Sequence, residues 1–233
     1  MLPARWLSIF ILVSFLVSCG RLPVIKPVDH VLLPDITKRC HQPFIDTPYR
    51  FIHAIEVILP GEGTGTVVGV TVIDPASETI HSAIMTIEGF VLFDAQYEKE
   101  MRVNRAVPPF NTKNFAEHLM KDIRLILLAP QGRLSKAGLL EDGSTICRYD
   151  ENQGRIIDVI VHQDSSWEIG LYSDSYETIR RVNASSIKNR IPTLVRLTAF
   201  DTRDYTLLLR LINAEPVSKR TMQLQPGESP DDE

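Results

Sequence analysis

The fold is decided by residues 49–97, which read YRFIHAIEVILPGEGTGTVVGVTVIDPASETIHSAIMTIEGFVLFDAQY. From Phe51 to Leu59 every second side chain is apolar or a histidine. This alternation places those side chains on one face of a β-strand. Further β-rich runs follow, separated by Gly-rich and Asp-Pro turns, at 66–73, 79–87 and 90–97. The stretch therefore predicts a meander of antiparallel strands joined by hairpins.

The hydrophobic period changes after the Pro108-Pro109 pair. Asn114 followed three residues later by Glu117 is the pattern of a helix N-cap and its box partner. Apolar side chains then recur at helical spacing on one side of the segment: Phe115, Leu119, Ile123, Ile126 and Leu127. We therefore predict one long helix over 115–128 and a short helical segment at 134–140.

Strand patterns resume after the helix and continue almost to the end of the chain. The predicted strands lie near 145–149, 156–162, 167–172, 178–184, 193–200 and 205–213. Together with the first meander they predict a mainly β protein of the α+β class. Its antiparallel sheet would be covered by the one long helix and the short segment.

The first 19 residues have the features of an export signal. Arg5 precedes an apolar run at 6–17, which is shorter than the about 20 residues that a membrane-spanning helix needs. The run ends in Leu16-Val17-Ser18-Cys19, which resembles the bacterial lipobox, whose Cys is lipidated and becomes the first residue after cleavage. We therefore predict a signal peptide at 1–18 and a lipid anchor on Cys19. The alternative is an ordinary signal with a chance Cys near its end.

Residues 19–48 have the composition of a tether. Five prolines forbid regular helix and favour extended backbone: Pro23, Pro27, Pro34, Pro43 and Pro48. A segment of this kind holds a folded domain away from the membrane surface. The alternative is that part of the segment packs on the domain, at Phe44-Ile45. The domain itself is predicted at 49–215, and the polar tail at 216–233 is expected to be disordered.

If Cys19 carries lipid, Cys40 and Cys147 remain as a pair. Exported proteins fold in an oxidising compartment, where such a pair often forms a disulfide. Two buried thiols are the alternative. A zinc site is disfavoured because the Cys40-His41 pair and Cys147 lack paired metal-ligand spacing.

The formal net charge of the 233-residue chain is −4, and 44% of its residues are hydrophobic. That is enough apolar material for a sizeable core. A mildly acidic chain without a basic cluster lacks the positive face that nucleic acids require. We therefore expect no nucleic-acid partner.

Motifs for chemistry are missing from the sequence. Gly61, Gly63 and Gly65 lead from one strand pattern into another, whereas a phosphate-binding loop leads from a strand into a helix. The six His residues are scattered, and those at 53, 81 and 162 fall within strand patterns without a second ligand nearby. We therefore predict no catalytic residues, no metal site and no cofactor.

One apolar face along many strands needs more cover than one long helix supplies. We therefore predict an apolar cavity between sheet and helix. The candidate wall residues are Val57, Val70, Leu92, Trp167, Ile169 and Leu209, with Phe115, Leu119 and Ile123 closing the cavity from the helix. An error of one residue in the facing of a strand would invert its candidate. A filled β core is the alternative.

The order of these elements resembles the LolA/LolB lipoprotein-carrier superfamily. It runs from lipobox to meander, helical insert and second meander, closing with IPTLVRL at 191–197 and YTLLLRL at 205–211. The resemblance implies a curved antiparallel half-barrel, or incomplete β-barrel, with helices closing its mouth and acyl chains on its concave face. No position matches the buried Arg of those carriers. The tip at 61–65, where the resemblance places an exposed apolar residue, carries none.

The resemblance also bears on location, because Gly20 in place of Asp after the lipidated Cys implies sorting to the outer membrane. The predicted function is that of an outer-membrane lipoprotein facing the periplasm. It would bind a lipid-like or acylated ligand in an apolar concave cavity. The alternative is a structural or assembly lipoprotein that binds an envelope protein partner through a sheet edge or an apolar patch.

Overall fold

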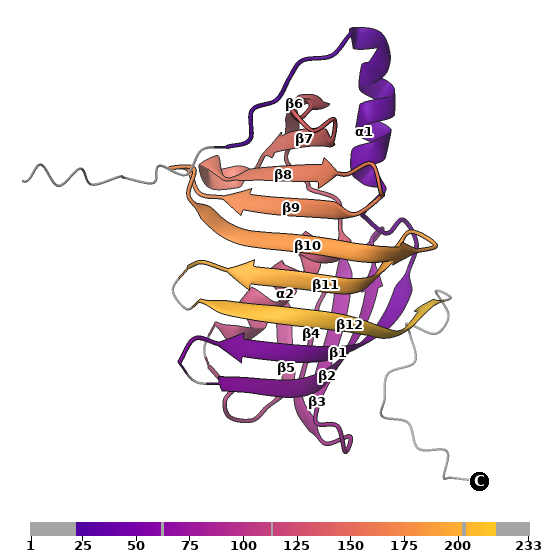
Figure 1. Cartoon of the computed structure of the whole chain (residues 1–233). Helices are drawn as coiled ribbons and strands as arrows, with labels where there is room; N and C mark the ends of the chain where they lie inside the picture. The colour runs from indigo at the N-terminus through magenta and orange to yellow at the C-terminus, as the bar shows by residue number, and fades with distance from the viewer. Residues whose placement is uncertain (1–21, 62, 113, 202–203, 218–233) are drawn as a thin grey trace, which may run out of the picture.

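The computed structural model describes residues 22–61, 63–112, 114–201 and 204–217. Its centre is one open, twelve-stranded sheet in the order β5-β4-β3-β2-β1-β12-β11-β10-β9-β8-β7-β6 (Figure 1), in which every neighbouring pair is antiparallel. The strands are β1 (Tyr49–Leu59), β2 (Gly63–Asp74), β3 (Thr79–Met85), β4 (Val91–Tyr97), β5 (Met101–Ala106), β6 (Arg133–Leu139), β7 (Thr145–Asp150), β8 (Ile156–Val161), β9 (Trp167–Tyr172), β10 (Thr178–Lys188), β11 (Ile191–Ala199) and β12 (Tyr205–Pro216).

The strand order explains where the helix must lie. The first meander runs outward from β1 to one edge of the sheet at β5, and the second begins at the opposite edge with β6. Helix α2 (Phe115–Leu127) connects the two edges, so the chain crosses a face of the sheet there. The sheet curves around this helix (Figure 1), in agreement with the half-barrel that the resemblance implies.

The core lies between α2 and the inner face of the sheet, and it has two parts. One part gathers buried side chains of β1–β4 against the helix residues Ala116, Met120 and Ile123. The other gathers buried side chains of β7–β11, with Ile126 at the far end of the helix. The helix therefore covers both meanders with its apolar side.

The segment before β1 is not the extended tether that we predicted. Residues 30–32 form the 3-10 helix η1 (His30–Leu32), and α1 (Leu33–His41) follows. Pro34 stands in the first turn of α1, where a helix does not need its missing N–H. The buried side chains of Ile36 and Cys40 then pack on the second meander. The expectation counted prolines and missed the favourable position of this one.

The disulfide between Cys40 and Cys147 is present, with a Cα–Cα distance of 6.1 Å. It joins the last turn of α1 to β7, and both residues are fully buried. The bond therefore fixes α1 to the sheet.

The helix content also differs from the expectation. We predicted one long and one short helix after 107, but the helices are α2 and α1, and residues 134–140 lie largely in strand β6. The pairing of β6 with β7 overrides the weak helical pattern of this segment. Strand β5, at the other edge, was not predicted either.

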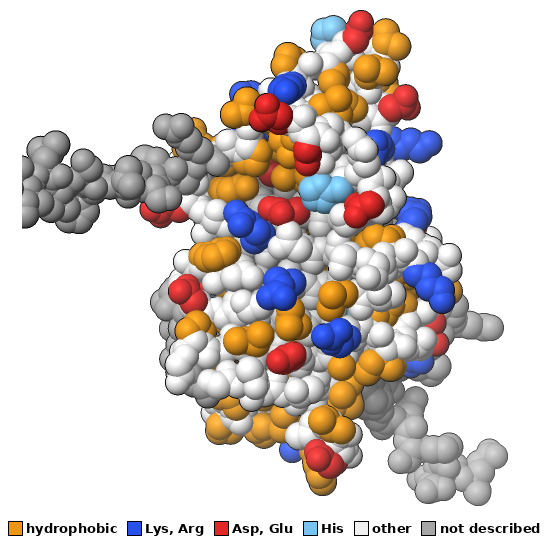
Figure 2. All heavy atoms as spheres, viewed as in Figure 1, with side chains coloured by type: hydrophobic (Ala, Val, Ile, Leu, Met, Phe, Trp, Pro, Cys, Tyr) orange, Lys and Arg blue, Asp and Glu red, His pale blue; other side chains and the backbone are white. Residues whose placement is uncertain are grey.

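The lipobox Cys19, the signal peptide at 1–18, Gly20 and the tail at 218–233 lie outside the described residues. Among the residues that are described, no helix is long and apolar enough to cross a membrane. On the face formed by β8–β12, Figure 2 shows charged side chains of both signs scattered among hydrophobic ones.

Candidate ligand cavity between helix and sheet

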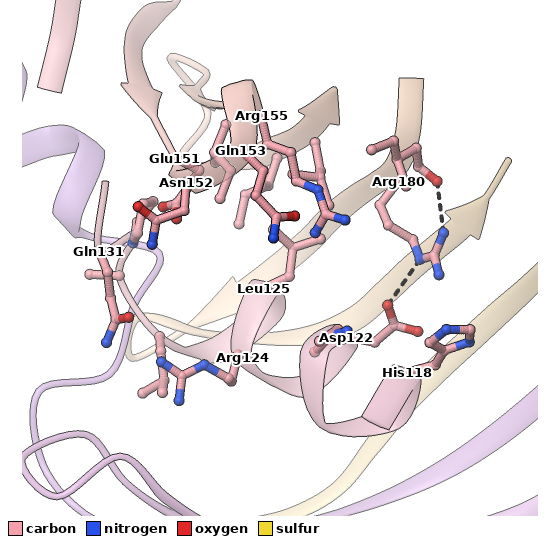
Figure 3. Close-up of a pocket in the computed structure, with 18 of the residues that line it drawn as sticks. His118, Asp122, Arg124, Leu125, Gln131, Glu151, Asn152, Gln153, Arg155 and Arg180 are labelled. Atoms are coloured by element: carbon pink, nitrogen blue, oxygen red, sulfur yellow. Dashed lines mark hydrogen bonds and ion pairs between the residues drawn. The ribbon is translucent and has the colours of Figure 1, made fainter. Parts of the chain in front are cut away.

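A cavity of about 450 Å³ opens between α2 and strands β8–β10. This volume lies within the range of small-molecule sites, about 300–1,000 Å³. Apolar side chains from the helix and the strands form much of its wall: Leu125, Leu128, Ile157, Ile169, Leu171 and Ile179. The loops after α2 and after β7 close one side (Figure 3). The cavity can therefore take an apolar chain away from water.

A buried ion pair stands at the opposite side of the cavity. Asp122 on α2 accepts a hydrogen bond from Nε of Arg180 on β10 at 3.0 Å (Figure 3). Nη1 of Arg180 lies 2.9 Å from Oδ1 of Asp201. Tyr205 on β12 donates a hydrogen bond to the second oxygen of Asp122. These contacts fasten the helix to two strands of the sheet.

Burial has the largest effect on the pKa values of Asp122 and Tyr205. Desolvation raises the pKa of the Asp122 carboxyl above its ordinary value, against the opposing charge of Arg180 and the hydrogen bond from Tyr205. Burial and the adjacent Asp122 also raise the pKa of the Tyr205 hydroxyl, so this tyrosine stays a hydrogen-bond donor. A charged pair with this little solvent contact depends on both partners being present.

The rest of the rim is polar and largely exposed. Arg155, Gln153 and Lys121 line the cavity, and Figure 3 shows the Arg155 side chain pointing towards it above Leu125. Arg155 has no carboxylate within ion-pair distance among the described residues. Glu151 and Asp201 also line the cavity. The site thus combines an apolar wall with cationic, amide and carboxylate groups around it, a composition that suits an amphipathic ligand.

A second, much smaller hollow of about 50 Å³ lies on the other side of α2. Its lining is mostly apolar and includes Trp167, Leu209 and Ile123, together with His53 of β1. A space of this size holds a few water molecules but no acyl chain of useful length. It is a packing gap of the core beside the larger cavity.

Comparison with known proteins agrees with this architecture. No protein-family model matches the sequence, and no curated protein matches it. The crystal structure of a LolA superfamily protein from Nitrosomonas europaea superposes with a TM-score of 0.51 and 10% sequence identity, covering 79% of this chain and 93% of that one. The chain has a LolA-like fold. A candidate outer membrane lipoprotein-sorting domain from Vibrio parahaemolyticus gives a TM-score of 0.49 at 8% identity over 81% and 95%, which is too low to add to the argument.

The LolA-like fold brings some of the predicted cavity residues together. Ile169 lines the larger cavity, whereas Trp167, Leu209 and Ile123 line the small hollow. Phe115 and Leu119 pack against the core of the first meander and line neither space. Val57 lies opposite Leu207 in the β1–β12 pairing, so the two side chains are on the same face of the sheet. Leu207 packs against the core of the second meander, which makes this the inner face.

Val70 and Leu92 are placed on the wrong face by the prediction. On β2 the buried positions are Gly69, Thr71 and Ile73, because the side chain of Ile55 lies over Gly69. A Cβ at that glycine would be 2.6 Å from Cδ1 of Ile55. A one-residue difference in facing thus puts Val70 on the outer face.

Leu92 shows the same error on β4. The buried positions of this strand are Phe93 and Ala95, so the side chain of Leu92 lies on the opposite face. Leu92 shares its face with Asp94 and Gln96, whereas Val91 and Tyr97 share the buried face with Phe93 and Ala95. The alternation of β4 therefore favoured the buried face, and the choice of Leu92 was wrong.

The ion pair of Asp122 and Arg180 was missed, although the sequence held a signal for it. Asp122 lies three residues after Leu119 and seven after Phe115, so it falls on the apolar side of the predicted helix. A carboxylate at such a position needs a buried partner. The partner comes from β10, and sequence spacing does not reveal it.

A serine and a histidine also lie close together outside the cavity. Ser144 Oγ is 2.9 Å from Nδ1 of His162, and it donates a hydrogen bond to Asp142. The serine is buried and also caps a turn through its backbone N–H. This arrangement lacks the exposed nucleophile and base-orienting carboxylate of a hydrolase.

His53 provides a pH-dependent test of the inner face. Burial lowers the pKa of His53 to about 4, whereas the unfolded chain has about 6.5. Folding therefore favours the neutral form of His53. The contribution of this neutral form to the free energy of unfolding is complete above about pH 6.5. It should be lost as the pH falls towards 4, by at most about 3 kcal/mol.

The measurement is the free energy of unfolding by urea between about pH 4 and pH 7. We expect His53→Leu to have a flatter pH dependence than the wild type across this window. Parallel curves for the two proteins would show that His53 is not held neutral in the fold.

Proposed function

We propose that this protein is a carrier that binds an acyl chain, or another lipid-like ligand, in the cavity of about 450 Å³ beneath α2. The observation that carries the proposal is this cavity, with its apolar wall and polar rim, in a LolA-like fold. Each CH₂ group taken from water contributes about 0.8 kcal/mol, so a chain of several carbons is held without any chemical step. The protein would act by sequestration and not as an enzyme.

Release of such a ligand requires α2 to move relative to the sheet. The contacts of Asp122 with Arg180 and Tyr205 oppose that movement. We infer that these contacts hold α2 against a bound ligand and that a partner or membrane must supply the free energy to move the helix.

The proposed location is the cell envelope, with the protein anchored by lipid on Cys19. Leu16-Val17-Ser18-Cys19 supports the anchor, and Gly20 favours the outer membrane, with the domain facing the periplasm. The ligand would then come from envelope lipid or lipoprotein trafficking.

A charged residue in the cavity wall should abolish acyl binding. Leu125 lies on α2, is half-buried and lines the cavity, so Leu125→Glu places a carboxylate where the chain would pack. We expect the affinity for a fluorescent fatty-acyl probe to fall on the order of tenfold or more, which corresponds to about 1.4 kcal/mol.

The matched control is Val70→Glu on the outer face, which should bind the probe as the wild type does. Circular dichroism and thermal unfolding of both variants test whether each remains folded. If the wild type does not bind the probe, or both variants lose binding equally, the cavity is not the ligand site.

The alternative function, assembly through a protein partner, is favoured by one exposed feature. The hairpin between β3 and β4 carries Ile87 and Phe90, which are 72% and 71% exposed. The resemblance placed such a residue at 61–65, which is in the β1–β2 hairpin, two hairpins earlier. An apolar hairpin tip suits a protein or membrane contact, and changing both residues to Ser would separate that contact from acyl binding.

A further inference from the structure

The segment that follows the lipobox is hydrogen-bonded to the folded domain at Pro23 and Lys26. Nη2 of Arg148 donates a hydrogen bond to the carbonyl of Pro23 at 3.0 Å. Lys26 and Leu139 exchange two backbone hydrogen bonds of 2.8 and 3.1 Å, which adds a short bridge to the edge strand β6. Gly138 permits this contact, because a Cβ there would lie 2.2 Å from the carbonyl oxygen of Lys26.

This attachment limits the distance between the body and the membrane. Three Cα–Cα steps separate Cys19 from Leu22, and each spans 3.8 Å, so Leu22 lies within about 11 Å of the lipidated residue in any conformation. The headgroup layer on each side of a bilayer is about 5–8 Å thick. A folded domain that holds Pro23 by a hydrogen bond therefore lies at the membrane surface and is not separated from it by a tether.

The surface at this end has the side chains that such a position requires. Val24 and Val31 are 82% and 81% exposed, and Leu32 is also exposed. The segment that carries them forms the outer end of the molecule beyond β6 (Figure 1). Figure 2 shows hydrophobic side chains at the same end, with cations and carboxylates among them, and Asp29 and Asp35 are the exposed acidic residues of this segment.

Lysine side chains at this end are also available to contact lipid headgroups. Lys26, Lys38 and Lys136 are exposed and have no carboxylate within ion-pair distance among the described residues. Exposed apolar residues interleaved with lysines match the interface of a bilayer that contains anionic lipid.

We propose that the β6 end of this protein, comprising residues 22–34 and the exposed side of β6, lies directly on the bilayer that holds Cys19, with Val24, Val31 and Leu32 in the headgroup region. The proposal rests on the proposed lipidation of Cys19, and it fixes how the domain is oriented. The β3–β4 hairpin lies far from this end (Figure 1), so Ile87 and Phe90 point away from the anchoring membrane and are available to a partner.

The test uses the full lipidated chain in vesicles of phosphatidylethanolamine and phosphatidylglycerol, with lipids brominated on the acyl chains as quenchers. Trp6 is lost with the signal peptide, and Trp167 is buried, so a new tryptophan reports its own position. We expect Val24→Trp and Val31→Trp to lose at least about half of the new fluorescence to brominated lipid, and the control Ile87→Trp to lose none.

The opposite pattern, with Ile87→Trp quenched and Val31→Trp unaffected, would overturn the orientation. Protection of position 31 from a water-soluble quencher without quenching by brominated lipid would indicate a protein neighbour instead, and would also reject the proposal.

The variant Cys19→Ser separates this inference from the anchor. If mass spectrometry of the wild type finds no lipid on Cys19, or the variant still carries lipid, the proposed lipidation is wrong. If Cys19 carries lipid, but positions 24 and 31 of the lipidated chain are not quenched, only the docking proposal fails. Acyl-probe binding to the cavity is measured independently of both.

Discussion

Loss of the disulfide is expected to lower the free energy of unfolding by about 4 to 5 kcal/mol. Cys40 and Cys147 are separated by 107 residues, and in the chain-entropy account a closed loop of about 100 residues restricts the unfolded state by about 4.7 kcal/mol. Such a loss is a large fraction of the about 5–15 kcal/mol that holds a typical domain folded. The measurement is urea unfolding of the Cys40→Ala, Cys147→Ala double variant against the wild type.

A reductant provides the matched control for this prediction. It should destabilise the wild type by a similar amount and leave the double variant unchanged. Limited proteolysis should then cut first in α1, which keeps the packing of Ile36 and the hydrogen bond from Nη2 of Arg39 to the carbonyl of His162 but has lost its covalent link to the sheet. A loss below about 1 kcal/mol would mean that the unfolded chain is already restricted without the bond.

The second large effect on the free energy of unfolding is expected from removing one partner of the buried ion pair. Arg180→Met leaves the Asp122 carboxylate in an almost solvent-free site, since the side chain of Asp122 is only 8% exposed. Breaking a buried pair in this way costs about 3–5 kcal/mol. The variant should therefore unfold at much lower urea concentration than the wild type, and α2 should exchange its amide hydrogens faster.

The double variant Asp122→Leu, Arg180→Met distinguishes pairing from packing. Because it removes both charges, we expect it to recover most of the lost stability. The single variant should also depend on pH. Burial raises the pKa of Asp122, and loss of the guanidinium removes the charge that opposes this rise.

The sign of that pH dependence follows from linkage. The folded variant binds a proton more tightly than the unfolded chain does, so its stability should increase as the pH falls through the raised pKa. A double variant no more stable than Arg180→Met, or a single variant with no such pH dependence, would contradict the pairing argument.

Several elements of the fold follow from the sequence because their determinants are local. The period-two patterns at 51–59 and 167–172 predicted strands where β1 and β9 lie, and the apolar spacing from Phe115 predicted α2. The cysteine count left one pair once Cys19 was set aside, and that pair forms the disulfide.

Local patterns failed where neighbouring segments decide the structure. Residues 134–140 lie in an edge strand because β7 and Lys26 pair with them. Helix α1 exists because Ile36 and Cys40 find a buried surface on the second meander, a gain that a count of prolines cannot include.

The sequence by itself therefore determined the mainly β class, the position of helix α2 and the cysteine pair, since periodicity and composition encode them directly. Only the tertiary structure decided which face of β2 is inside, because both faces of this strand carry apolar residues and the choice depends on neighbours such as Ile55 over Gly69. It also decided the cavity and the pairing of Asp122 with Arg180, which lie 58 residues apart. Contacts at such separations arise from the curvature of the whole sheet around α2, and no local pattern carries that information.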